Sequence, residues 1–233
     1  MISISNLIKI YGEATVTDIP ALQIPEGESF GLVGNNGAGK TTLFRMLLDL
    51  VRPTSGEIAI NGHDVKNSSG WRHYVGSFLD ENFLIPYLTP DEYFELVGQL
   101  HGCRKEDLKV FLSQFEEFFN GEILGKKKYI RDLSKGNIKK AGIVAALIGQ
   151  PRVVVLDEPF ESLDPTSQIR LKELIAGEHK NRNTTFLISS HDLNHVTEIC
   201  NRIVLMEKGK VINDMKGGHE ALKELEMYFK ISE

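Results

Sequence analysis

The sequence predicts an α/β fold in which a mainly parallel sheet is covered by helices on both faces. Continuously apolar runs such as 153–156 are typical of strands that are buried on both sides of a parallel sheet. In the second half of the chain, helical patterns separate these runs, and strands that alternate with helices form such a sheet. A length of 233 residues suffices for a full core, so we expect a single domain spanning 1–233.

The chain begins with segments that have strand character. The runs 7–11 and 21–24 are bounded by glycine and proline, and we expect them to belong to an N-terminal antiparallel β subdomain. A further strand is predicted at 57–62, where it enters an Asn-Gly turn. Tyr11 ends the first run, and its ring either packs in the core or presents a face on which an adenine can stack.

A glycine-rich loop joins the next strand, at 29–33, to a helix whose apolar residues recur at helical spacing. The loop 34–41 fits G-x-x-x-x-G-K-[ST], in which backbone N–H groups and the helix N-terminus cradle phosphates. Lys40 is expected to reach the β- and γ-phosphates, and the Thr41 hydroxyl to hold Mg²⁺. The sequence therefore predicts a nucleoside triphosphate site. Its candidate residues in this segment are Gly34, Asn35, Asn36, Gly37, Ala38, Gly39, Lys40, Thr41 and Thr42.

Helical patterns replace strands between 81 and 149. The segment 89–92, Thr-Pro-Asp-Glu, offers an N-cap, a proline at the first helical position and early acidic residues. Apolar residues from 108 to 119 recur on one helical face. We expect 81–149 to be an inserted helical subdomain, with 1–80 and 150–233 forming the nucleotide-binding core.

Polar side chains follow two of the predicted strands, at the edge where open α/β sheets bind ligands. Asp157 comes directly after the strand 153–156 and is expected to hold Mg²⁺ through water. Glu158 is expected to polarise a water for attack on the γ-phosphate, and His191, after the strand 184–188, to donate to a γ-phosphate oxygen. Adjacent carboxylates are often only a solvated pair and a lone histidine is often structural, but the preceding buried strands favour the catalytic interpretation.

Composition excludes several classes of protein. The chain is 41% hydrophobic and 25% charged, as in soluble globular proteins, and its net charge of −5 gives no support to nucleic acid as a main partner. Cys103 and Cys200 have neither metal-site spacing nor the density of a disulfide framework, which is typical of a reducing cytosol. Because no stretch approaches the ~20 apolar residues of a membrane span, we expect another chain to supply any membrane part.

The motifs resemble, in their order and spacing, those of the ATP-binding cassette (ABC) ATPases, and the resemblance covers essentially the whole chain. The matching segments are 34–41, 133–137, 156–159, 162–164 and His191. The resemblance implies a P-loop NTPase fold and a clamp of two ATPase subunits, identical or different, that face each other head to tail. Each ATP, with Mg²⁺, would lie between the P-loop of one subunit and the signature residues of the other.

The resemblance also assigns roles to single residues. Glu158 would position the hydrolytic water, His191 would sense the γ-phosphate, and Asp164 would belong to the loop that joins the two sites. Tyr11 matches the aromatic residue that stacks on adenine. The signature residues that would contact the γ-phosphate across the interface are Ser134, Lys135, Gly136 and Asn137. They precede a helix predicted at 138–147, whose N-terminus suits an anion.

Two departures from the family pattern affect these expectations. The signature reads Leu-Ser-Lys-Gly-Asn where Leu-Ser-Gly-Gly-Gln is usual, and the short Asn137 weakens the expected contact. The family's glutamine between the core and the helical subdomain is replaced by Asp80, or by Glu81 if the loop shifts by one residue. Asp80 can coordinate a cation but lacks an amide donor, so hydrolysis is expected to be slow or coupled differently to the partner.

We expect the ATPase subunit of a membrane transporter, peripheral at the cytoplasmic face of the cell membrane and bound to an integral permease. The segment 86–89 resembles the exporter branch, so export is favoured over import. The permease is expected to dock beside 80–87. Two alternatives stay open. One is a soluble cassette ATPase of DNA repair, iron–sulfur assembly or translation. The other is an ATP-gated clamp that scarcely hydrolyses, which Asp80 and Asn137 motivate.

Overall fold

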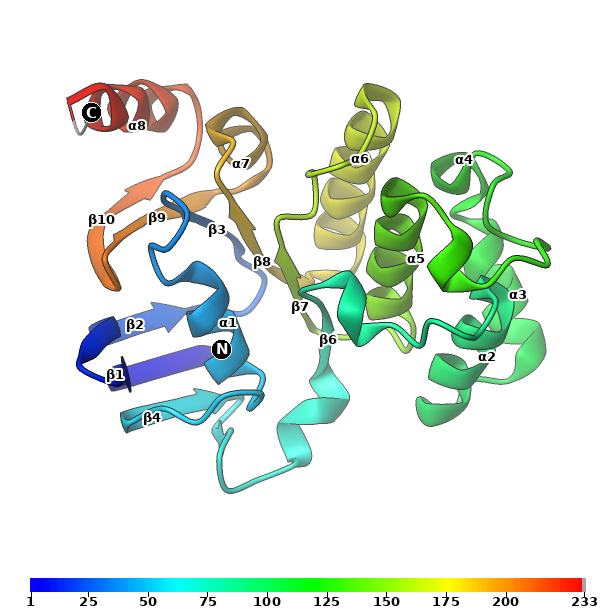
Figure 1. The fold of residues 1–233 in the computed structure, drawn as a ribbon, viewed down its shortest axis with the longest axis horizontal. Coiled ribbons are helices and arrows are strands. Elements are labelled where there is room, and N and C mark those ends of the chain that lie inside the picture. Colours follow the sequence, from blue (N-terminus) through cyan, green and yellow to red (C-terminus); the bar gives the residue numbers. More distant parts are fainter. Residues whose placement is uncertain (232–233) are drawn as a thin grey trace.

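The structure, a computed structural model, describes residues 1–231 and contains two sheets. The smaller sheet is antiparallel and lies at one end of the molecule (Figure 1). Its spatial order is β2-β1-β4-β5. Its strands are β1 (Ile2–Tyr11), β2 (Ala14–Ile24), β4 (Ser55–Ile60) and β5 (His63–Asp64). Strand β2 continues through Pro20, where we expected a break, because an edge strand tolerates the missing N–H donor.

The larger sheet has the order β10-β9-β3-β8-β7-β6 and is parallel except for β10. Its strands are β3 (Ser29–Val33), β6 (Val75–Phe78), β7 (Val153–Asp157), β8 (Thr185–Ser190), β9 (Arg202–Glu207) and β10 (Lys210–Lys216). Strands β3, β7 and β8 are neighbours that run in the same direction and are buried throughout. The loops after these strands therefore meet at one edge of the sheet, and the predicted α/β fold is confirmed.

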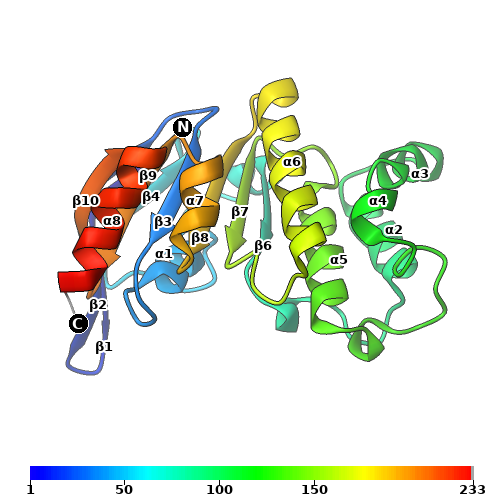
Figure 2. The same cartoon turned by 90° about the horizontal axis from the view of Figure 1, so that it is seen from above.

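Two apolar clusters lie on opposite faces of the larger sheet, because successive side chains of a strand point to opposite sides. Val153 and Val155 belong to the cluster that contains α1 (Lys40–Leu47) and the small sheet, so α1 is enclosed between the two sheets (Figure 1). Val154 and Leu156 belong to the cluster on the other face. Figure 2 shows the helices of that face side by side. They are α6 (Pro165–Arg182), α7 (Leu193–Ile199) and α8 (His219–Ile231).

A group of helices extends from the edge of the core beside β6 and β7 (Figure 2). Its α-helices are α2 (Pro90–Leu100), α3 (Lys105–Ser113), α4 (Glu116–Phe119) and α5 (Lys135–Leu147). Short 3₁₀ turns are η1 (Gly70–Tyr74), η2 (Glu81–Phe83) and η3 (Ile130–Asp132). The group forms the helical lobe of the molecule, defined here as 81–147. The predicted subdomain boundaries at 81 and 149 stay a prediction.

Helix ends in the lobe follow local capping rules, with two corrections. Thr89 caps α2 in a reciprocal capping box with Glu92. The single helical face expected over 108–119 is divided between α3 and α4, since Phe115 leaves helical geometry and is buried between them. Helix α5 begins at Lys135 rather than at 138, because the Ser134 side chain accepts from the Asn137 N–H and supplies the cap.

Candidate functional site

The glycine-rich loop is shaped by close contacts with the neighbouring backbone. Gly34 has φ +156°, and a Cβ there would lie 2.3 Å from the Met206 carbonyl oxygen. Gly39 precedes α1 with φ +104°, and a Cβ there would lie 2.7 Å from the Val16 carbonyl oxygen. A side chain at either position is therefore excluded. The loop opens directly into the N-terminus of α1, as a phosphate cradle requires.

Lys40 lies buried beneath this loop, although lysine side chains are rarely buried in folded proteins. Its Nζ donates to the Gly34 carbonyl oxygen at 2.6 Å and lies 3.5 Å from Glu158 Oε1. A buried ammonium with these two contacts is already aimed across the cradle. An incoming phosphate would meet a cation that needs little reorganisation.

Asp157 is the last residue of β7, and each of its carboxylate oxygens accepts a hydrogen bond from a hydroxyl group. Thr41 Oγ1 donates to Asp157 Oδ2 at 2.6 Å, and Ser189 Oγ donates to Asp157 Oδ1. Burial raises the pKa of the Asp157 carboxyl, against the lowering influence of these two hydrogen bonds. Sequence reasoning missed Ser189. The signal that identifies it is its strand register, since Ser189 pairs with Asp157 across β8 and β7.

These oxygen donors fit Mg²⁺. A hydroxyl and a carboxylate are hard ligands, and Mg²⁺ commonly takes one or two carboxylates while water and substrate phosphates fill its other positions. Within residues 1–231 there is no cluster of three or more His, Cys, Asp or Glu side chains around one point. Asp80 lines the same pocket as Thr41 and Asp157, but its Oδ1 accepts from the Asn82 N–H at 2.8 Å and from Asn82 Nδ2 at 2.7 Å.

Glu158 and His191 are brought together, a contact that the sequence did not indicate. Glu158 Oε2 lies 2.9 Å from His191 Nδ1 and accepts from the His191 N–H at 3.2 Å. The Glu158 backbone has φ +46°, which is unusual for a residue with a side chain, and its N–H donates to Ser189 Oγ at 3.0 Å. The carboxylate therefore joins Lys40 on one side and His191 on the other.

A pocket of about 300 Å³ lies between the core and the helical lobe at this edge of the sheet. Its polar lining includes Thr41, Asp80, Asp157, Glu158, Lys135 and Lys139. The resemblance implied that Lys135 acts across a subunit interface, yet here it lines the pocket of its own chain. Lys139 was not singled out in the sequence. Burial lowers the pKa of the Lys139 ammonium, while the carboxylates of Glu161 and Glu158 raise it.

The other signature residues do not line this pocket. Ser134 caps α5 by accepting from the Asn137 N–H at 3.3 Å, and Asn137 Nδ2 donates to Glu122 Oε2 at 2.8 Å. A Cβ at Gly136 would lie 2.9 Å from the Ser162 carbonyl oxygen, so the glycine permits a close approach of α5 to the loop before α6. Ser134, Gly136 and Asn137 are therefore absent from the lining of this pocket.

Neither Asp164 nor Tyr11 lines this pocket. Asp164 caps α6, and hydrogen bonds from the Ser167 side chain and backbone lower the pKa of its carboxyl. The Tyr11 ring is 50% exposed and has Lys9 Nζ 4.7 Å from its centroid, so the core interpretation of Tyr11 is wrong. Because the Tyr11 ring is exposed, it is accessible to a ligand, and its role in stacking on adenine stays a prediction.

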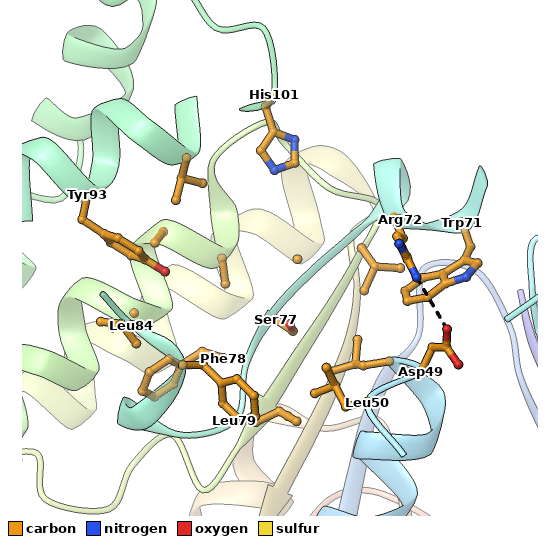
Figure 3. Close-up of a pocket in the computed structure, with 18 residues that line it drawn as sticks. Asp49, Leu50, Trp71, Arg72, Ser77, Phe78, Leu79, Leu84, Tyr93 and His101 are labelled. Atoms are coloured by element: carbon orange, nitrogen blue, oxygen red, sulfur yellow. Dashed lines mark hydrogen bonds and ion pairs between the residues drawn. The ribbon is translucent and has the colours of Figure 1, made fainter. Parts of the chain in front are cut away.

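A larger cavity of about 430 Å³ lies along β6, between the core and the lobe (Figure 3). Tyr93 and His101 face Leu50 and Asp49 across it, and Ser77 lies between them. Arg72 closes one end through an ion pair with Asp49 at 3.5 Å. We call this cavity the lobe groove. It meets the predicted docking segment 80–87 at Phe83 and Leu84.

Asp157→Asn is expected to raise the melting temperature of the nucleotide-free protein by a few degrees at neutral pH. The amide keeps the shape of the carboxyl and its oxygen can still accept from one of the two hydroxyl groups, while the substitution removes the buried charge. Because the folded-state pKa of Asp157 is raised, its favourable contribution is present below its unfolded-state pKa and is lost as the pH rises through the folded value.

The gap in melting temperature between Asp157→Asn and the wild type should therefore widen as the pH rises above about 4. Thermal unfolding at a series of pH values measures the gap. A gap that stays constant from acid to neutral pH contradicts the assignment of Asp157 as a buried charge.

Comparisons with known proteins find extensive similarity. A sequence model of the family described as "ABC transporter" matches residues 18–161. YhaQ of Bacillus subtilis, an uncharacterised ABC transporter ATP-binding protein, is 35% identical over 229 residues, which are 98% of this chain and 74% of the relative. The bacitracin transport ATP-binding protein BcrA of Bacillus licheniformis is 32% identical over 224 residues, 94% of this chain and 71% of the relative.

The fold is also shared with a solved structure. The dimeric structure of MJ0796, described as a bacterial ABC transporter cassette, superposes with a TM-score of 0.84 at 25% identity. The superposition covers 93% of this chain and 98% of that chain. No helix within residues 1–231 is both long and apolar enough to cross a membrane.

Proposed function

The chain belongs to the ABC transporter family and is an ATP-binding subunit of a transport system, and on that premise we propose that it hydrolyses ATP to power export through a separate permease. The observation that carries the proposal is the setting of Glu158. Its carboxylate lies 3.5 Å from Lys40 Nζ and 2.9 Å from His191 Nδ1. A carboxylate between the phosphate-binding lysine and a histidine can act on a water aligned with the γ-phosphate.

Phosphoryl transfer to water needs positioning and charge stabilisation more than covalent chemistry. The N–H groups of the loop 34–41 and the Lys40 ammonium would hold the phosphates. Glu158 would orient the attacking water and accept its proton, and His191 would donate to a γ-phosphate oxygen. Mg²⁺, held by Thr41 and Asp157, would neutralise phosphate charge. The products are ADP and phosphate.

A second ATPase subunit would complete the pocket. Ser134, Gly136 and Asn137 lie outside the pocket of their own chain, on the N-terminus of a 13-residue helix that has no acidic residue in its first turn. Such a helix end suits an anion supplied by a neighbouring subunit. The dimeric MJ0796 cassette supports pairing of this kind. The clamp would form from two copies of this chain or from this chain and a related one.

The lobe groove is the surface that we assign to the permease. The groove is lined by residues of both the core and the helical lobe. A helix bound there would therefore move when the angle between the core and the lobe changes. Its lining is apolar around Phe78 and Leu79 and polar at Arg72 and His101, as expected of a site for an amphipathic segment. The complex would lie at the inner face of the cell membrane. Export rests on the resemblance of 86–89 to the exporter branch.

Ser77→Trp is expected to block docking, since Ser77 lies exposed at the centre of the lobe groove and an indole would fill part of its volume (Figure 3). A clash of ~1.4 kcal/mol suffices to lower the yield of co-purified permease about tenfold. The measurement is recovery of an integral membrane protein with the tagged chain from detergent-solubilised membranes. Ser113→Trp, at an exposed position on α3, is the control. Equal recovery with Ser77→Trp contradicts the assignment.

An ATP-gated clamp with little hydrolysis is favoured by one observation. Asp80 Oδ1 accepts from Asn82 and Asn137 Nδ2 donates to Glu122, so both side chains have a partner in their own chain, and Asp80 lacks the amide donor of the family's glutamine. Phosphate release in the presence of the permease separates the two functions, because a clamp that does not hydrolyse ATP releases none. A soluble cassette ATPase would instead co-purify with no integral membrane protein.

A further inference from the structure

Lys139 is a partly buried cation that lines the nucleotide pocket from the helical lobe. Its side chain is 14% exposed, and its Nζ donates to the Glu158 carbonyl oxygen at 2.7 Å. Its nearest carboxylate, that of Glu161, is 3.9 Å away and largely exposed, which makes a weak ion pair. A buried ammonium requires a good acceptor, and the Glu158 carbonyl is the one at hydrogen-bonding distance.

The contact falls on a residue whose backbone has a positive φ. Glu158 has φ +46°, a conformation that is unfavourable for a residue with a side chain and needs support from its surroundings. Support comes from both sides of the residue. Its N–H donates to Ser189 Oγ, and its carbonyl accepts from Lys139 and, at 3.3 Å, from the Glu161 N–H. In this conformation the carboxylate reaches Lys40 and His191.

Of these three hydrogen-bond partners, Glu161 lies in the same loop as Glu158, and the other two belong to different parts of the molecule. Ser189 lies on β8 in the core, whereas Lys139 lies on α5, one turn after the cap at Ser134. A shift of α5 by ~1 Å away from the core would carry the 2.7 Å contact out of hydrogen-bonding range. The backbone conformation of Glu158 therefore depends on where the helical lobe lies.

We infer that Lys139 is a positioning residue, which holds the backbone of Glu158 so that its carboxylate is competent only when the helical lobe is docked on the core. The inference rests on the proposed function of Glu158 in ATP hydrolysis. It gives α5 a role at two sites. Its N-terminus would meet ATP held by the partner subunit, while Lys139 supports the catalytic carboxylate of its own chain. Binding of ATP in one pocket would thereby affect the position of Glu158 in the other pocket.

The test compares Lys139→Met, Lys139→Arg and Lys109→Met in the full-length chain. Methionine keeps most of the aliphatic stem but removes the donor, and arginine restores a donor. Lys109 is exposed on α3 of the same lobe and serves as the matched control. Loss of a charge-assisted hydrogen bond should lower kcat for ATP hydrolysis about tenfold or more in Lys139→Met. KM for ATP should stay within about twofold, and Lys139→Arg should recover most of the loss.

A second measurement needs no nucleotide. Hydrogen exchange of the backbone amides at 158–163 should become about tenfold faster in Lys139→Met and stay unchanged in Lys109→Met. Unchanged exchange, or an unchanged kcat in Lys139→Met while the wild type turns over, overturns the inference and leaves the proposed function intact. If the wild type does not hydrolyse ATP even with its permease, the proposed function is wrong. Faster hydrogen exchange in Lys139→Met would in that case still show that Lys139 stabilises the Glu158 backbone.

Discussion

Glu158→Gln should lower the rate of ATP turnover at least about 100-fold while ATP still binds, because a carboxamide cannot accept the proton of the attacking water. The substitution keeps the shape of the side chain and removes the charge that faces Lys40 and His191. It leaves the glycine-rich loop and the Thr41–Asp157 pair unchanged. ATP would therefore remain between two subunits and hold them together.

Phosphate release and size-exclusion chromatography measure the two effects. The variant should elute as a dimer in the presence of ATP and Mg²⁺ and as a monomer without ATP. Glu173→Gln removes the same charge from an exposed position on α6 and should behave as the wild type. A Glu158→Gln variant that hydrolyses ATP normally excludes Glu158 as the base, and a strictly monomeric one contradicts the head-to-tail clamp.

Lys40→Ala is expected to abolish measurable ATP binding, with a loss of affinity of at least about 30-fold. Removing a buried, hydrogen-bonded charge that pairs with a ligand costs ~2–5 kcal/mol, and each 1.4 kcal/mol is a factor of about ten. The loss is large here because Lys40 is buried under the cradle and already aimed across it. A flexible surface lysine would contribute much less.

Equilibrium binding of ATP to the purified chain measures the effect. Lys66→Ala, at an exposed position after β5, is the control for loss of a lysine. A normal melting temperature shows that the fold persists in Lys40→Ala. Retained affinity for ATP in a folded Lys40→Ala variant would falsify the assignment of 34–41 as the phosphate cradle.

Local signals accounted for most of the predicted elements. The strand at 29–33 appears as predicted, and a helix follows the glycine-rich loop as predicted, because the apolar run and the glycines constrain the backbone within a few residues. The capping box at Thr89 is a local rule of the same kind. The errors arose where tertiary context overrode a local signal, as at Pro20 on an edge strand and at Phe115 between two helices.

The residues of the candidate site also divide into those that local motifs predict and those that only tertiary contacts identify. Lys40, Thr41, Asp157 and His191 could be named from motifs, but their partners could not, because the contacts join residues that are far apart in the chain. Ser189 reaches Asp157 only since β8 lies beside β7. Lys139 reaches Glu158 only since the lobe returns to the core through α5.

The sequence by itself determined that this chain carries a glycine-rich loop that fits a phosphate-binding motif, two catalytic candidates after buried strands and the motif order of an ABC ATPase. Those features depend on residue types and on short distances along the chain, both of which the amino-acid sequence specifies directly. Only the tertiary structure decided that Glu158 is held between Lys40 and His191, and that Lys135 and Lys139 face the pocket of their own chain. Strand order and the position of the lobe fix these contacts, and neither follows from spacing along the chain.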